Sequence, residues 1–176
     1  PEVTWDELCK VIGSLPSNKA PGPNGLPGNL LKFSQDLWAP LLTLYLNAIL
    51  RTGIPASLAC STIVPIFKKG QCASPSCYRP ISLIDIVVKS MGRVWLNRLQ
   101  TWAEENNILK DIQYGLRKGR GTVEQCLNLY LLISKYAVAK GGVIYLAFMD
   151  LSSAFDRVNR TKLWGYWGPW WWMLKS

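Results

Sequence analysis

An aspartate directly follows a run of seven apolar residues. Residues 143–149 are VIYLAFM, and Asp150 is the next residue. The β-branched and aromatic side chains favour a strand buried on both faces, so that Asp150 would lie where the chain leaves the core. A carboxylate in that position can bind Mg²⁺ together with the phosphates of a substrate, or it can cap the following turn. The residues alone leave both interpretations open.

Two β-prone segments carry basic residues at neighbouring ends. Residues 61–70 are STIVPIFKKG and residues 78–84 are YRPISLI, with a polar connection between them, which predicts a β-hairpin. In such a hairpin Lys68 and Lys69, at the end of one strand, would meet Arg79 at the start of the other. These cations could hold a triphosphate, Arg79 through its planar fork and a lysine as a point charge. They could equally protect an edge strand against aggregation.

A glycine-rich basic loop precedes another predicted helix. Residues 113–122 are QYGLRKGRGT, in which Arg117, Lys118 and Arg120 alternate with three glycines. Free backbone amides, the positive end of a helix dipole and these cations together predict an anion-binding site. The loop lacks the Gly-Lys-Ser/Thr ending of a nucleoside-triphosphate P-loop. The alternative is a flexible basic loop.

Helices and loops must position these side chains, and their order predicts a mixed α+β fold without regular βαβ alternation. Capping-box patterns at Thr4 and Thr122 predict helices over residues 4–15 and 122–139. Pro40 and Gly53 delimit a third helix over residues 41–51. Residues 16–29 hold four prolines and three glycines and are expected to form a shaped loop.

A fourth helix is predicted by apolar residues at three- and four-residue steps. It covers residues 85–106, and its expected buried stripe is Val88, Met91, Trp95, Leu99 and Trp102. The long apolar side chains on one face imply packing against a neighbouring element.

The charge balance favours a polyanionic partner. The chain has 20 Lys and Arg against 11 Asp and Glu, a net charge of +9, which is typical of nucleic-acid binding and less often of binding to anionic membrane surfaces. No apolar run reaches the roughly 18 residues of a membrane-spanning helix, and no signal-peptide pattern begins the sequence. We therefore expect a protein that is neither secreted nor inserted in a membrane, and that is intracellular, with the nucleus as one candidate location.

Four blocks of the sequence together resemble a known family. In order they are NKAPGPNGLP, IVPIFKKG followed by YRPISLI, QYGLRKGRGT and FMDLSSAFDRV. They are similar to the successive blocks of reverse transcriptases encoded by non-LTR (LINE-type) retrotransposons, over about residues 1–164. The resemblance implies part of a right-hand polymerase fold: a fingers-like region over residues 1–106 and the start of the palm over residues 107–163. A divergent tryptophan-rich tail follows over residues 164–176.

The resemblance also implies roles for individual residues. Asp150 matches the first catalytic, metal-binding aspartate of the family, and the expected cofactor is Mg²⁺. The implied nucleotide-binding residues are Lys68, Arg79, Leu151 and Phe155, of which Phe155 matches the bulky residue that excludes a ribose 2′-hydroxyl. The implied template-binding residues are Lys19, Arg117, Lys118 and Arg120. RNA template, DNA primer and deoxynucleoside triphosphates are the expected partners, and Asp156 is expected to be structural.

The chain departs from the family pattern at its end. The family's Tyr/Phe-Ala-Asp-Asp box, which supplies further metal ligands, does not occur, and no Asp or Glu follows Asp156. The tail could be an aromatic platform that stacks bases or a sticky apolar patch. We therefore expect a polymerase fragment that is inactive alone. The alternative function is a non-catalytic, basic nucleic-acid-binding relic.

Overall fold

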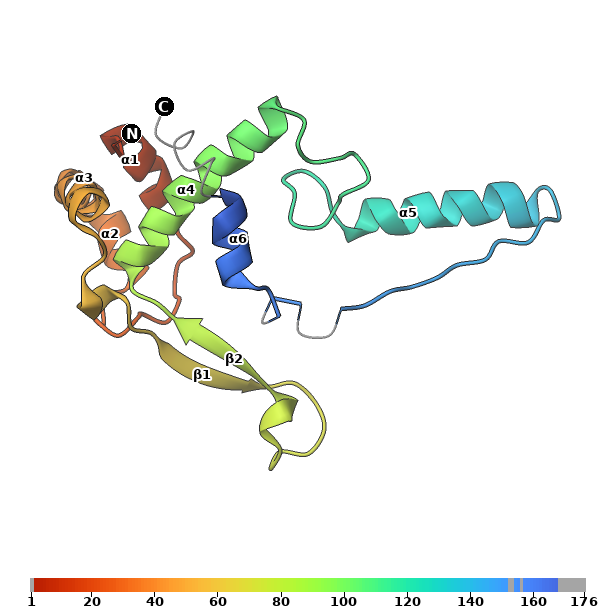
Figure 1. The fold of residues 1–176 in the computed structure, drawn as a ribbon, viewed down its shortest axis with the longest axis horizontal. Coiled ribbons are helices and arrows are strands. Elements are labelled where there is room, and N and C mark those ends of the chain that lie inside the picture. Colours follow the sequence, from red (N-terminus) through yellow and green to blue (C-terminus); the bar gives the residue numbers. More distant parts are fainter. Residues whose placement is uncertain (1, 152–153, 156, 168–176) are drawn as a thin grey trace. The chain divides into compact units, whose positions relative to one another are not determined.

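The computed structural model describes residues 2–151, 154–155 and 157–167. The chain divides into two compact units, an N-terminal unit up to Thr101 and a C-terminal unit from Trp102 (Figure 1). The described residues are mostly helical and contain a two-stranded antiparallel sheet, which agrees with the predicted mixture of helices and a hairpin. No helix among them is long and apolar enough to span a membrane.

The N-terminal unit contains three helices, a hairpin and most of a fourth helix. The helices are α1 (Trp5–Ser14), α2 (Gly28–Phe33), α3 (Gln35–Thr52) and α4 (Ile86–Glu105), and the strands are β1 (Thr62–Phe67) and β2 (Tyr78–Leu83). The capping box predicted at Thr4 is confirmed. The Glu7 amide donates to Thr4 Oγ1 over 3.3 Å, and Glu7 Oε2 accepts from the Thr4 amide over 3.0 Å.

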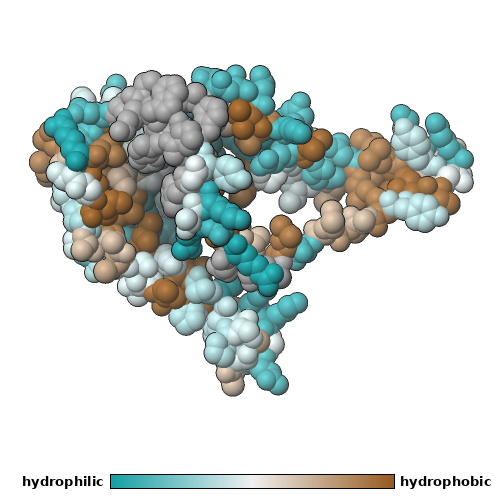
Figure 2. Space-filling view, in the orientation of Figure 1, coloured by the Kyte–Doolittle hydropathy of each residue, from teal (hydrophilic) through white to brown (hydrophobic). Residues whose placement is uncertain are grey.

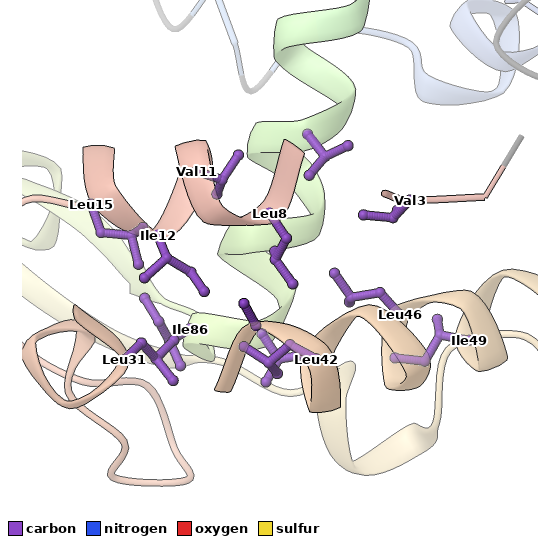
Figure 3. Close-up of a cluster of buried hydrophobic side chains, with 13 residues drawn as sticks. Val3, Leu8, Val11, Ile12, Leu15, Leu31, Leu42, Leu46, Ile49 and Ile86 are labelled. Atoms are coloured by element: carbon purple, nitrogen blue, oxygen red, sulfur yellow. The ribbon is translucent and has the colours of Figure 1, made fainter. Parts of the chain in front are cut away.

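The hydrophobic core of this unit is formed by α1, α2, α3 and the first half of α4 (Figure 3). Leu8, Val11 and Ile12 follow the helical repeat of α1 and are fully buried. The side chains of Leu8 and Ile12 point toward the face of α3 that carries Leu42 and Leu46 (Figure 3). The remaining members of the cluster are Val3, Leu15, Leu31, Ala39, Ile49, Ile86, Val87 and Val94.

Helix α3 is longer than the sequence predicts. It begins at Gln35, so Pro40 lies inside it and not in its first turn. Ala39, beside the proline, is fully buried, and the helix continues although Pro40 has no amide to donate. The predicted end is confirmed, because the Gly53 amide donates to the Ile49 carbonyl over 2.8 Å and Gly53 adopts a φ of 96°.

Helix α4 is confirmed, but its buried face is not the predicted stripe. The buried residues are Ile86, Val87, Ser90 and Val94, whereas Val88, Met91, Trp95, Leu99 and Trp102 are only half-buried. Sequence periodicity missed Ser90 because its side chain is polar. The Ser90 hydroxyl donates to the Ile86 carbonyl over 2.8 Å, which satisfies it within the helix and allows burial.

The proline- and glycine-rich loop is fastened to the beginning of α4. Asp85 is 2% exposed, and its Oδ1 accepts a hydrogen bond from the Asn24 amide over 3.0 Å. Gly22 lies so close that a Cβ on it would come within 2.5 Å of the Asp85 nitrogen and the Ile84 carbonyl carbon. The loop is therefore shaped, as predicted, and Gly22 is the residue that permits its close approach.

The C-terminal unit has no buried residue in its described part. It contains α5 (Thr122–Ile133), which continues as a π-helical turn (Ser134–Val138), and α6 (Arg160–Trp167). The N-cap of α5 is Gly121 and not the predicted Thr122. The Gly121 amide donates to Glu124 Oε2 over 2.7 Å, so only the glutamate half of a capping box forms.

The predicted buried strand over residues 143–149 is wrong. This segment is extended but unpaired (Figure 1), and it is exposed, with Tyr145 at 92% and Met149 at 96%. The reason is the lack of a partner: β1 and β2 pair with each other, and the described part of the C-terminal unit contains no strand. Apolar residues also gather on the surface of α5 (Figure 2). Asp156 and most of the tryptophan-rich tail lie outside the described residues.

An ion pair joins α1 to α4 at the surface of the core. Arg98 Nε and Nη2 donate to the two carboxylate oxygens of Glu7, each over 2.7 Å, and Arg98 also donates to the Glu2 carbonyl over 2.8 Å. The guanidinium of Arg98 lies over the ring of Trp95, 5.2 Å from its centroid. Hydrogen bonds from Arg98 lower the pKa of Glu7 from 4.5 to about 2, against the opposing effect of desolvation.

Loss of this pair should make the N-terminal unit less stable in a pH-dependent way. Because the pKa of Glu7 is lower in the folded state, its contribution to stability is complete above pH 4.5 and is lost as the pH falls toward 2. Glu7→Gln should lower the free energy of unfolding by about 1–2 kcal/mol at pH 7 and by much less at pH 2. Urea melts at both pH values measure this, with Asp6→Asn as the control. Equal losses at both pH values would contradict it.

The contact at Gly22 gives a second stability prediction. Gly22→Ala should lower the free energy of unfolding by about 1–3 kcal/mol, because the new methyl group meets backbone atoms that cannot turn away. Gly13→Ala is the matched control, since a Cβ there meets nothing within 4 Å and alanine favours the helix. Thermal unfolding followed by circular dichroism compares the two variants. Identical midpoints would rule out a tight contact at Gly22.

Candidate functional site

Asp150 lies at the edge of a hollow in the C-terminal unit. The hollow has a volume of about 270 Å³ and is lined by Asp150, Leu151, Ala154, Arg157 and Val158. Asp150 is exposed, so its carboxylate can meet a ligand from solvent. The structure thus brings the predicted residues Asp150 and Leu151 to one hollow.

Of two further residues in this block, one lines the hollow and the other does not. Phe155 is 79% exposed and does not line the hollow with Leu151. Arg157 does line it, and sequence reasoning missed this residue. The sequence could have indicated Arg157, because it lies seven residues after Asp150 in the same block, and a cation there could neutralise a phosphate beside the carboxylate.

The donor set at Asp150 fits part of a magnesium site. Mg²⁺ binds one or two protein carboxylates and completes its shell with water and substrate phosphates. Asp150 can supply one such ligand, and within residues 2–151, 154–155 and 157–167 no group of three His, Cys, Asp or Glu side chains is close enough to hold a metal ion. The other lining side chains, apolar or cationic, cannot add a ligand.

The hairpin brings Lys68 and Arg79 to the same end of its two strands. Ile66 pairs with Arg79, and the ladder continues because the Lys68 amide donates to the Cys77 carbonyl over 2.8 Å. Side chains alternate along a strand, so Lys68 lies on the face of Ile66 and therefore of its cross-strand partner Arg79. This register favours Lys68 over Lys69 as the partner of Arg79, a choice that the sequence left open.

The hairpin is exposed, and its loop end is held together by two contacts. All six residues of β1 are exposed, and the rings of Phe67 and Tyr78 meet edge to face with their centroids 5.4 Å apart. The Tyr78 hydroxyl donates to the Cys72 carbonyl over 2.9 Å, which ties the connecting loop to β2. Lys68 and Arg79, next to these contacts, are both exposed to solvent.

Arg117, in the basic loop, is paired with a carboxylate of α4. Its Nε and Nη2 donate to the two carboxylate oxygens of Glu104 over 2.8 and 2.6 Å, and its Nη1 donates to the Lys110 carbonyl over 3.1 Å. The hydrogen bonds from Arg117 lower the pKa of Glu104, and those to Glu104 raise the pKa of Arg117. Sequence reasoning missed this pair because its members lie 13 residues apart in different elements.

Arg120 is paired as well, whereas Lys118 is not. Arg120 Nη2 donates to Asp111 Oδ1 over 2.6 Å, and its guanidinium lies 5.2 Å from the centroid of the Tyr114 ring. Lys118 is exposed, and no carboxylate among the described residues pairs with it. The amide of Gly121 is bonded to Glu124, so the predicted anion site is partly occupied by the chain's own acids.

Lys19 lines a second hollow, in the N-terminal unit. This hollow has a volume of about 140 Å³ and lies between the proline- and glycine-rich loop and the first turn of α4, which contributes Lys89. Its remaining lining residues are Leu15, Pro16, Ala20, Pro21, Gly22, Leu26, Gly28 and Ile86.

Residues 66–167 match the family described as reverse transcriptase (RNA-dependent DNA polymerase). The RNA-directed DNA polymerase from mobile element jockey of Drosophila melanogaster is 33% identical over 158 residues, 89% of this chain and 17% of that protein. The probable RNA-directed DNA polymerase from transposon BS of the same species is 37% identical over 155 residues, 87% of this chain and 17% of that protein. The chain thus spans 17% of the length of these two relatives.

The family match includes Lys68, Arg79, Arg117 and Asp150, the residues at the centre of three of the four sequence blocks. The two relatives align with 89% and 87% of the chain. The predicted resemblance is therefore confirmed: the chain belongs to the reverse transcriptase (RNA-dependent DNA polymerase) family and is homologous to the RNA-directed DNA polymerases of LINE-type retrotransposons.

Proposed function

We propose that the chain forms the fingers and the beginning of the palm of an RNA-directed DNA polymerase. In this proposal Asp150 is a catalytic, metal-binding residue, and RNA template, DNA primer and deoxynucleoside triphosphates are the partners. The main support for this proposal is the position of Asp150. It lies inside the segment that matches the family, and it is exposed at a hollow that Arg157 also lines. A carboxylate that only capped a turn would not need a hollow beside it.

Each of the two units carries residues that we propose to contact the nucleotide. Lys68 and Arg79 share one face of the hairpin, and together they offer a point charge and a planar fork to a triphosphate. Leu151 and Phe155 are exposed and could contact the sugar and base. A divalent ion at Asp150 would neutralise phosphate charge, and the chain's own contribution is to present one carboxylate.

The template strand would be held by basic residues of two loops. Lys19 and Lys118 are exposed and have no acidic partner among the described residues, so they can bind phosphates directly. Arg117 and Arg120 are the other candidates, and phosphates would have to compete there with Glu104 and Asp111. Binding of this kind weakens as salt rises.

The alternative is a basic nucleic-acid-binding protein without catalysis. The net charge of +9 favours it independently of Asp150. Both proposals place the protein inside the cell, with nucleic acid, and they differ in whether Asp150 and Mg²⁺ take part in ligand binding.

Nucleotide binding distinguishes the two functions. Mg²⁺ should tighten the binding of a deoxynucleoside triphosphate to the chain severalfold, and Asp150→Asn should remove this gain while leaving metal-free binding unchanged. Isothermal titration calorimetry with and without Mg²⁺ measures the two affinities. Primer extension by the chain alone should stay at background, because a single carboxylate completes no two-metal site.

The matched control is Asp36→Asn, which removes one exposed carboxylate on α3 with the same change in net charge. If Mg²⁺ has the same effect on Asp150→Asn as on the unmodified chain, Asp150 is not a metal ligand. RNA binding that persists under those conditions would favour the non-catalytic alternative.

The pairing of Arg117 gives a further prediction on RNA binding. Glu104→Gln should release the guanidinium, tighten the binding of single-stranded RNA, and steepen the dependence of log K on log salt by about 0.7 for one added phosphate contact. Fluorescence anisotropy at several salt concentrations measures this slope.

Glu105→Gln is the control, because it removes the same charge from the neighbouring exposed residue of α4, which holds no arginine among the described residues. If both variants tighten RNA binding equally, the effect is one of net charge alone. Arg117 would then have no specific contact with RNA.

A further inference from the structure

Helix α3 is apolar on two opposite faces. Between Asp36 and Arg51 its sequence is LWAPLLTLYLNAIL, which contains no charged residue. One face, with Leu42 and Leu46, is buried in the core. The opposite face carries an exposed stripe, defined by Leu37, Leu41, Leu44 and Ala48 at steps of four, three and four residues. A helix that is apolar all round is typically covered on every side, so the exposed stripe is suited to a protein partner.

The two polar side chains in the same stretch are already bonded within the N-terminal unit. Asn47 Oδ1 accepts from the Val3 amide over 2.7 Å, and Asn47 Nδ2 donates to the Val3 carbonyl over 3.0 Å. The Thr43 hydroxyl donates to the Ala39 carbonyl over 2.7 Å. The exposed stripe therefore offers apolar contact and neither charge nor side-chain hydrogen bonds. Such a surface favours another apolar protein face over a nucleic acid, whose phosphates need cations.

The charges at the two ends of the exposed stripe are opposite in sign. Asp36 lies in the first turn of α3, and it forms no ion pair in the part of the chain that the structure describes. Arg51 lies in the last turn and pairs with Glu2, but its side chain is 71% exposed, so its guanidinium has donors left for a second carboxylate.

This arrangement is complementary to itself. When two copies of α3 lie side by side and antiparallel, the first turn of each helix is next to the last turn of the other, so Asp36 of one copy meets Arg51 of the second. The midpoint between these charges falls at residues 43–44, and the midpoint of the exposed stripe falls at residues 42–43. One antiparallel alignment therefore matches the apolar side chains and both pairs of charges.

We propose that the exposed stripe of α3 binds a second copy of this chain. The two helices pack antiparallel about a twofold axis near Leu44, and the pair of Asp36 with Arg51 forms twice, as in an isologous interface. One stripe on each copy offers far fewer residues than the roughly 20–30 per partner of a standard interface, so we expect a dissociation constant on the order of 10 μM. The interaction is separate from the proposed contacts with metal, nucleotide and template.

Sedimentation velocity of the full chain, from about 1 to 100 μM, tests the proposal. The unmodified chain should change from monomer to dimer over this range. Leu44→Glu should raise the dissociation constant at least about tenfold, because it places a charge at the centre of the interface. Leu44 is 70% exposed, so this change leaves the core intact. Leu127→Glu is the matched control, since Leu127 is an exposed leucine on α5, outside the exposed stripe.

An exchange of charges tests the antiparallel alignment. In Asp36→Lys both ends of the stripe are basic, and in Arg51→Glu both are acidic, so each variant alone should dimerise about tenfold more weakly than the unmodified chain. An equimolar mixture of the two should form a heterodimer, because opposite charges meet again at both ends. The loss of the exposed pair of Arg51 with Glu2 has little effect on folding.

The inference is overturned if the unmodified chain stays monomeric at about 100 μM, well above the expected dissociation constant. It is also overturned if Leu127→Glu weakens association as much as Leu44→Glu, since the association would then come from apolar residues in general. A mixture of the two charge variants that forms no heterodimer rules out the antiparallel alignment and the proposal with it. Thermal unfolding midpoints equal to that of the unmodified chain establish that each variant is folded.

Discussion

The buried carboxylate of Asp85 is the contact that fixes the proline- and glycine-rich loop against the beginning of α4. It precedes α4, is 2% exposed, and accepts the Asn24 amide, so that a loop too rich in proline and glycine for regular structure is held at a helix end. Gly22 makes this approach possible because no side chain stands between the two backbones. The hollow that contains Lys19 and Lys89 is a consequence of this contact, since its walls come from both segments.

The ion pairs within the described part of the chain are all formed by arginines, although other arginines, such as Arg79 and Arg93, form none there. Arg51, Arg98, Arg117 and Arg120 each hold a carboxylate of the chain, while Lys19, Lys68, Lys89 and Lys118 hold none among the described residues. A guanidinium forms two parallel hydrogen bonds with a carboxylate, which makes it suited to structural pairs. The basic loop is thus partly neutralised by Glu104 and Asp111, whereas the hairpin and the N-terminal loop keep their cations available.

Local patterns in the sequence predicted the elements, and long-range contacts decided the rest. Thr4 with Glu7, and Gly53, marked helix ends correctly because capping is a matter of neighbouring residues. The hairpin and its converging cations Lys68 and Arg79 also followed from local composition. Apolar periodicity did not predict the burial of Ser90. This serine can be buried because its hydroxyl donates a hydrogen bond within the helix. Sequence periodicity could not reveal the ion pair of Glu104 with Arg117. It also could not reveal that Arg157 lines a hollow with Asp150 or that Lys89 lines one with Lys19, because these neighbours depend on the path of the chain between them.

Residues 143–149 show why a strand pattern alone does not make a strand. Their apolar, β-prone side chains favour an extended backbone, and the backbone is extended, but a strand needs a neighbour for its amides and carbonyls. In the described part of the C-terminal unit no such neighbour exists, and these residues and the apolar side chains of α5 stay in contact with solvent. Such a surface is unfavourable in water and is typical of a face that packs against further protein. A carboxylate must be held rigidly to bind a metal ion beside phosphates. Residues 143–149 lead directly to Asp150, so a fixed position of Asp150 would depend on further protein that packs against this segment. The N-terminal hollow, in contrast, is formed by contacts within its own unit.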